Sequence, residues 1–87
     1  MRYNQDILNM LPVRDAAGAT MAIIDRAQDL SPEAQIVAIT ASFKLLIERF
    51  GITAQDAFAI ADNIMNHADG RRVEFDAVRA YLENEVG

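Results

Sequence analysis

The sequence predicts an all-α fold: a compact bundle of four main helices preceded by a short N-terminal helical segment. Apolar residues recur at spacings of three and four through most of the chain. Helix start and stop signals divide that pattern into separate helices. Only residues 71–75 alternate between polar and apolar over the length of a strand. With 87 residues, the chain is expected to form one domain spanning residues 1–87.

The first two helices are expected on either side of a proline. Asn4 is the predicted N-cap of the short segment, and Pro12 ends that segment. Asp15 is the predicted N-cap of a helix that runs to about Gln28. Its apolar face is predicted to consist of Ala16, Ala19, Ile23 and Ala27, widened by Met21 and Ile24. Gly18 near its start either permits close approach of a neighbouring helix or is a tolerated glycine.

The third helix has the clearest boundaries. Ser31 is its predicted N-cap, Pro32 suits the first helical position, and Gly51 is a C-terminal stop signal. Between them lies a heptad-like apolar seam, formed by Ile36, Ile39, Phe43, Leu46 and Phe50. Three further apolar residues lie beside this apolar seam: Val37, Leu45 and Ile47. A stripe this wide predicts a helix at the centre of the bundle, packed on more than one side.

Two more helices are expected in the second half of the chain. Thr53 is the predicted N-cap of the fourth helix, with Asp56 three residues later in an acidic variant of the capping box. Its predicted apolar face is Ala57, Ile60, Ala61, Ile64 and Ala68, extended by Phe58 and Met65. Asp69-Gly70 is expected to turn the chain. The last helix is predicted from about Glu74 to Glu85, with its inward face formed by Phe75, Val78, Tyr81 and Leu82.

The composition limits the expected cellular location of the protein and the classes of partner that it could bind. The chain is 52% hydrophobic and 24% charged, a balance that excludes intrinsic disorder. No apolar run approaches the roughly 20 residues of a membrane span, and residues 1–6 lead into no apolar signal region. Cysteine is absent, so we expect no disulfide and a cytoplasmic location. The net charge of −5 argues against nucleic acid and anionic membranes as partners.

Residues 46–55 have the pattern of a helix-turn-helix, with an apolar helix end, a turn glycine and a capped second helix. Ile47 stands where a small residue is usual, and Ala57 stands where a β-branched residue is usual. No Lys or Arg lies between Arg49 and Arg71. Three acidic residues lie there instead: Asp56, Asp62 and Asp69. The possible readers of base edges are Gln55, Asn63 and Asn66. A DNA-binding transcriptional regulator is therefore the alternative function, behind an ordinary helical connection.

Two segments resemble acyl carrier proteins: residues 48–52 resemble the end of the second helix of that family, and residues 76–82 resemble its last helix. The family attaches its phosphopantetheine to a serine in an Asp-Ser-Leu motif. The corresponding position here is Ile36, and residues 29–31 have the order Asp-Leu-Ser. The sequence therefore predicts no carrier function and no cofactor.

His67 is the only histidine, and it forms a His-x-Asp pair with Asp69. Zinc requires three or four ligands, and the chain offers no second histidine and no cysteine. We therefore expect no metal site and interpret His67 as a favourable charge near a helix C-terminus. No motif for nucleophilic catalysis or phosphate binding is present, so we expect no enzymatic activity.

The apolar residues on more than one side of the third and fourth helices predict a surface beyond the core of one chain. We expect a non-enzymatic protein–protein interaction module, an adaptor, inhibitor or regulator, with homodimerisation as the first account and a groove for a partner helix as the second. The candidate anchors are Phe43, Phe50, Phe58 and Tyr81, each with the alternative of a core position. The candidate docking face for a basic partner, or else a solvated face, is Asp56, Asp62, Asn63 and Asn66.

Overall fold

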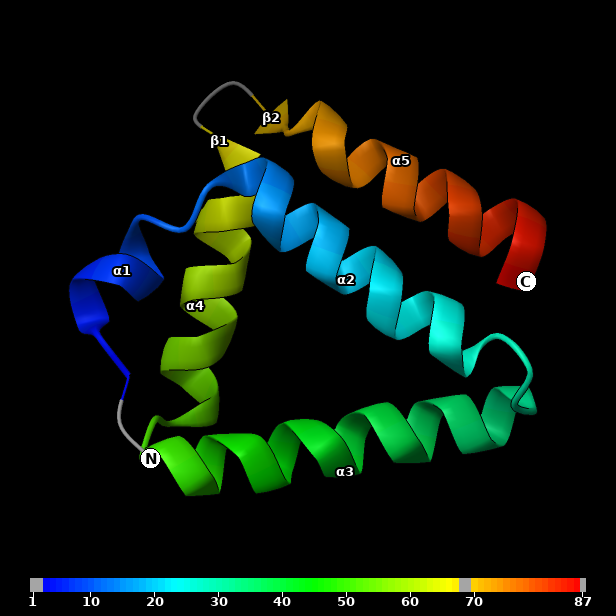
Figure 1. Cartoon of the computed structure of the whole chain (residues 1–87), viewed down its shortest axis with the longest axis horizontal. Coiled ribbons are helices and arrows are strands. Elements are labelled where there is room, and N and C mark those ends of the chain that lie inside the picture. Colours follow the sequence, from blue (N-terminus) through cyan, green and yellow to red (C-terminus); the bar gives the residue numbers. More distant parts are fainter. Residues whose placement is uncertain (1–2, 68–69, 87) are drawn as a thin grey trace.

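The computed structural model describes residues 3–67 and 70–86 and confirms the predicted all-α bundle (Figure 1). A short helix is followed by four main helices, and the last of these continues into a π-helical turn. In chain order the elements are α1 (Gln5–Asn9), α2 (Val13–Ala27), α3 (Pro32–Phe50), α4 (Ala54–Met65), β1 (Asn66–His67), β2 (Gly70–Arg71), α5 (Val73–Tyr81) and η1 (Leu82–Val86). Among the helices of the described ranges, none has the length and apolar character that a bilayer crossing requires.

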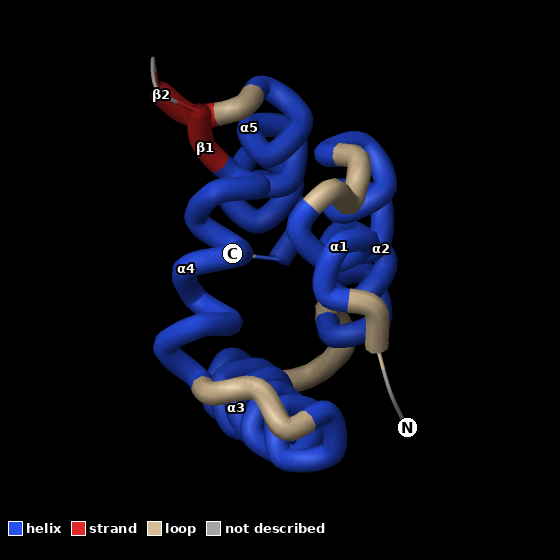
Figure 2. The backbone as a smooth tube through the Cα atoms, turned by 90° about the vertical axis from the view of Figure 1, so that its left-hand side faces the viewer, coloured by secondary structure: helices blue, strands red, loops and turns tan. Residues whose placement is uncertain are grey.

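The helices form a flat molecule with α3 along one edge. Figure 1 shows α2, α3 and α4 as three sides of a triangle, with α5 alongside α2 and α1 beside α4. Figure 2, turned by 90°, again places α3 at the edge, away from α5. The extents are 34 × 32 × 18 Å. The radius of gyration is 13.7 Å. A compact chain of this length has a value of about 12 Å.

Side-chain caps fix where three of the helices begin. Asn4 Oδ1 accepts hydrogen bonds from the backbone N–H groups of Asp6 (2.8 Å) and Ile7 (3.1 Å) at the start of α1. Ser31 Oγ accepts from the N–H of Ala34, and Thr53 Oγ1 accepts from the N–H of Asp56. Each such cap is worth about 1 kcal/mol. Three of the four predicted N-caps are therefore confirmed.

The predicted cap at Asp15 is wrong, because α2 begins at Val13. Pro12 occupies the N-cap position with φ −58° and ψ 136° and makes no side-chain cap. The ring of proline fixes φ near this value, so the backbone enters the helix without a capping side chain. Asp15 lies in the first turn instead, where a carboxylate is favoured by the helix dipole.

The end of α4 also differs from the prediction. The helix stops at Met65, because Asn66 is extended (φ −132°, ψ 161°) and pairs with Arg71 in a two-residue antiparallel hairpin. The alternation predicted over residues 71–75 is therefore a strand only at its first residue, and α5 begins at Val73. The predicted helical position of Ala68 and the Asp69 half of the turn lie outside the described residues.

The core lies between α2 and α5. Among the described residues, Ala17, Phe75 and Val78 are buried. The small side chain of Ala17 lets the two larger side chains of α5 approach the α2 backbone closely. Partly buried residues surround this contact: Val13, Ala16, Met21, Ile24, Ile64 and Met65. The core therefore joins α2, α5 and the end of α4.

Two predictions about packing are wrong. The face of α2 that enters the core is centred on Ala17, whereas Ala19 and Ile23 of the predicted face are exposed. In addition, α3 is not central, because none of its residues is buried and its main contact is with α4. The physical reason is that α5 packs on α2 through Phe75 and Val78, so the core forms between these two helices and not around α3.

Gly18, within α2, and Gly51, at the end of α3, differ in whether the backbone conformation requires glycine. Gly18 is exposed, and nothing lies within 4 Å of where its Cβ would be, so no close helix approach depends on it. Gly51 ends α3 in the left-handed region, with φ 72°.

We expect Gly18→Ala to raise the free energy of unfolding by about 0.5–1 kcal/mol, because alanine loses less backbone entropy in a helix. Gly51→Ala should lower it by about 1–2 kcal/mol, because a side chain is strained at that φ. Urea unfolding at one protein concentration measures both. A destabilised Gly18→Ala variant would show that a neighbour packs against this position.

Candidate interaction surface

The chain exposes more surface than a compact monomer of its mass. Its accessible surface is 6706 Å² for 9.6 kDa. A compact monomer of that mass exposes about 5,100 Å², so the excess is about 1,600 Å². Much of it is apolar, because fourteen large hydrophobic side chains are exposed among the described residues and only three residues are buried. Contiguous exposed apolar patches larger than a few hundred Å² are typical of interaction sites.

The exposed side chains include three of the five residues of the apolar seam on α3. Ile36 is 68% exposed and Leu46 is 55% exposed, and Ile39 is exposed as well. Phe43 and Phe50 are half-buried. Spacings of three and four place all five on one face of the helix. The heptad-like face of α3 is therefore present in the structure, and most of it has no apolar cover.

Phe58 extends the apolar seam from α3 onto α4. Its ring stacks on the ring of Phe43 with a centroid distance of 5.1 Å and an interplanar angle of 23°. Phe58 is nevertheless 60% exposed, so this stack closes only one side of each ring. The pair joins α3 to α4 and forms an aromatic centre for the exposed surface. The apolar seam together with Phe58 forms the seam surface.

Two other exposed residues of α3 lie off the apolar seam. Val37 is next to Ile36 and Leu45 is next to Leu46, and both are about two-thirds exposed. Consecutive helical residues are separated by about 100° around the axis. Each therefore matches a neighbour in chemistry and exposure while projecting in a different direction, which makes the two residues natural controls for the apolar seam.

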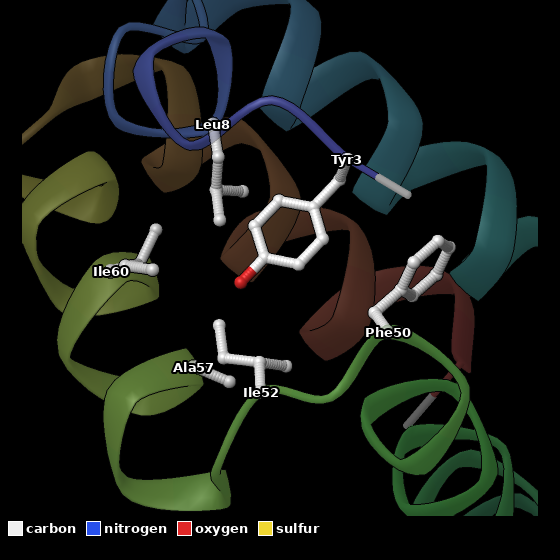
Figure 3. Close-up of a pocket in the computed structure, with 6 residues that line it drawn as sticks. All are labelled: Tyr3, Leu8, Phe50, Ile52, Ala57 and Ile60. Carbon is white, nitrogen blue, oxygen red and sulfur yellow. The ribbon is translucent and has the colours of Figure 1, made fainter. Parts of the chain in front are cut away.

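Phe50, the last residue of the apolar seam, borders a small apolar pocket (Figure 3). The pocket measures about 250 Å³ and is lined by Tyr3, Leu8, Phe50, Ile52, Ala57 and Ile60. Tyr3 and Leu8 flank the N-cap of α1 at the N′ and N4 positions, and Ile52 and Ala57 do the same for α4. Two hydrophobic staples therefore meet in one pocket.

Tyr3 connects this pocket to α3. Its ring meets the ring of Phe50 edge-on, with a centroid distance of 6.0 Å and an interplanar angle of 86°. Figure 3 shows its hydroxyl directed into the pocket between Leu8, Ile52 and Ile60. The volume of the pocket is below the range of about 300–1,000 Å³ that is usual for ligand sites. We interpret the pocket as the packing contact between α1 and the α3–α4 connection.

The four residues predicted to form an acidic or polar face do not all lie together. Asp56 and Asn63 are exposed and line one shallow hollow of about 370 Å³. Asp62 precedes Asn63 and projects about 100° away from it. Asn66 is the C-cap of α4, and its Nδ2 donates to the carbonyl oxygen of Asp62 (3.0 Å). Asp56 and Asn63 therefore share the hollow, and Asn66 contacts only the backbone of Asp62, so the four side chains do not form one face.

Tyr81 is half-buried at the C-terminal end of α5, far from Phe43 and Phe58 in the chain. Its hydroxyl lies 2.7 Å from Asp25 Oδ1 and 2.8 Å from Gln28 Oε1. These contacts hold α5 against the end of α2. The side chain thus has a structural partner within the chain.

Sequence reasoning did not include Tyr3, Leu8 or Ile52 in any site. The signal was present, because each N-cap was recognised and a staple is defined by the apolar residues on either side of the cap. Among the described residues, no group of three or more His, Asp or Glu side chains lies close enough together to hold a metal ion. The side chain of His67 is outside the description.

Comparison of the chain with protein-family models, with curated protein sequences and with solved structures finds no match in any of the three.

We expect Ile52→Ala to lower the free energy of unfolding by about 1–2 kcal/mol, because it removes a half-buried staple side chain from the pocket. Leu45→Ala should change it by less than about 0.5 kcal/mol, since Leu45 is 65% exposed and lies off the apolar seam. Thermal and urea unfolding compare the two variants. Equal losses would contradict the pocket as the joint between α1 and the α3–α4 corner.

Proposed function

We propose that the protein is a non-enzymatic protein–protein interaction module, an adaptor, inhibitor or regulator, and that it binds its partner through the seam surface. The observation that carries the proposal is the exposed apolar seam on a helix that contains no buried residue. Exposed apolar side chains in water are unfavourable, so a regular row of them is stabilised when a partner covers it.

The dimensions of the surface favour a macromolecular partner. From Ile36 to Phe50 the apolar seam covers 15 residues. The 14 steps between them, at 1.5 Å per step, give about 21 Å of helix. That length suits a helix or another extended apolar surface, and it is longer than a small-molecule site requires. Phe43 and Phe58 are the proposed anchors, because aromatic side chains near the centre of an interface contribute most to binding.

Charged residues would border the interface rather than form it. Asp56 and Asn63 line a hollow on another side of α4, where the carboxylate of Asp56 would favour a basic partner. The chain contains no cysteine, which suits the reducing cytoplasm as its place of action.

The test is the size of the protein in a lysate of its own cells, measured by gel filtration at native abundance. We expect the protein to elute in an assembly larger than 9.6 kDa. Ile39→Glu should return it to the monomer position, because a buried charge without a partner is strongly unfavourable. Val37→Glu, adjacent but off the apolar seam, should leave the assembly intact.

A wild-type chain that elutes as a folded monomer at native abundance would overturn the proposed function. So would an assembly that both variants leave unchanged, because its partner would then bind elsewhere. Far-UV circular dichroism of each purified variant confirms that helix content is retained.

A further inference from the structure

The α1 arm, residues 3–11, is attached to the rest of the chain by few contacts. Every residue of this segment is exposed except Leu8, which is half-buried. The hydrogen bonds of the arm are internal to it, including those that Asn4 accepts at the start of α1. Among the described residues, no hydrogen bond or ion pair joins the arm to the four main helices. The arm is therefore held in place by apolar contacts.

Two side chains of the arm provide these apolar contacts. Tyr3 meets the ring of Phe50 edge-on, and Tyr3 and Leu8 both line the apolar pocket (Figure 3). The corner residues are the four half-buried residues of the pocket that belong to the α3–α4 corner: Phe50, Ile52, Ala57 and Ile60. The arm is thus the cover that the chain itself supplies for the corner residues.

The helix of the arm depends on the same two side chains. It has only five residues. Isolated helices shorter than about 12–15 residues are marginal in water, because the first turn is costly to form. The helix therefore persists only while Tyr3 and Leu8 stay in the pocket, and the helix and the cover are lost in one step.

The core of the molecule does not depend on the arm. The buried residues of α2 and α5 and the partly buried residues around them include no residue of the arm and no corner residue. Pro12 separates the arm from α2, since its ψ of 136° is extended and its nitrogen carries no hydrogen to donate. No helical hydrogen bond therefore continues from α1 into α2. The arm can leave the pocket while the core stays folded.

We propose that the α1 arm is a detachable cover, which opens about Pro12 by local unfolding and exposes the corner residues while the core remains intact. Opening of this kind requires less free energy than global unfolding, because few apolar contacts are lost. The open state needs no partner, so the proposal goes beyond the proposed function and stands apart from it.

Opening also changes the surface that a partner meets. With the arm open, the apolar surface continues from Phe50 at the end of the apolar seam to Ile52, Ala57 and Ile60. A partner that contacts these residues has to wait for the open state, and its apparent affinity is reduced by the fraction of chains that are open. The closed arm is then an autoinhibitory contact, a consequence that rests on the proposed function.

A single cysteine in the pocket tests the detachable cover in the purified full chain. The natural chain has no cysteine, so A57C carries the only thiol. Iodoacetamide should alkylate this thiol while the arm is open, and mass spectrometry measures the rate. Tyr3→Ala should raise the rate by at least about 10-fold, because the closed state loses its ring contact and its apolar burial. Ile7→Ala should change it by less than about 3-fold, since Ile7 is 65% exposed and does not line the pocket.

Two further variants separate opening of the arm from other causes. Q55C places the thiol at an exposed position of α4, where Tyr3→Ala should leave the alkylation rate within about 3-fold. Val78→Ala weakens the core between α2 and α5, which contains no residue of the arm. It should leave the rate of A57C within about 3-fold if the thiol is reached by local opening. Far-UV circular dichroism confirms that each variant retains its helix content.

An A57C rate that Tyr3→Ala does not raise would overturn the proposal, because the arm would then not cover the pocket. A rate that Val78→Ala raises as much as Tyr3→Ala does would also overturn it, since the thiol would be reached only by global unfolding. Either result leaves the proposed function to be decided by the size of the protein in a lysate of its own cells.

Discussion

The packing of Phe75 and Val78 of α5 against Ala17 of α2 is the contact on which the rest of the structure depends. It uses the small side chain at position 17 to bring two helices that are distant in the sequence into close contact. The hydroxyl of Tyr81 lies 2.7 Å from Asp25 at the other end of the same helix pair. Because α5 takes this face of α2, the long helix α3 has only α4 as a major neighbour. The core therefore forms without α3, and most of the apolar seam stays exposed.

The two ends of the molecule differ in how they are stabilised. At one end, α2 and α5 form the core together with Ile64 and Met65 of α4. At the other end, aromatic contacts and the staple pocket fasten α1, α3 and α4 to each other, with Phe43 on Phe58 and Tyr3 on Phe50. The second end buries less apolar surface, so its stability depends more on whatever covers α3. A partner on the seam surface would therefore act on folding and on assembly at the same time.

Local signals predicted the helices well, and long-range packing was the part that they did not determine. Helices begin after the N-caps Asn4, Ser31 and Thr53, and α3 ends at Gly51, as capping chemistry predicts. The apolar seam was recognised from its spacing, but the same spacing is expected for a helix in the core and for a helix in an interface. Sequence alone therefore placed α3 at the centre, and it chose Ile23 rather than Ala17 for the core side of α2. The face that a helix buries depends on which neighbouring helix packs against it. The spacing of apolar residues in the sequence does not contain that information.

The measurement that tests this account most directly is amide hydrogen exchange across the purified single chain. The α2–α5 contact is internal, whereas α3 has no buried residue. The amides of α3 should therefore be less protected than those of α2 and α5. Protection of α3 equal to that of α2 and α5 would contradict the account, because α3 would then be stable without a partner.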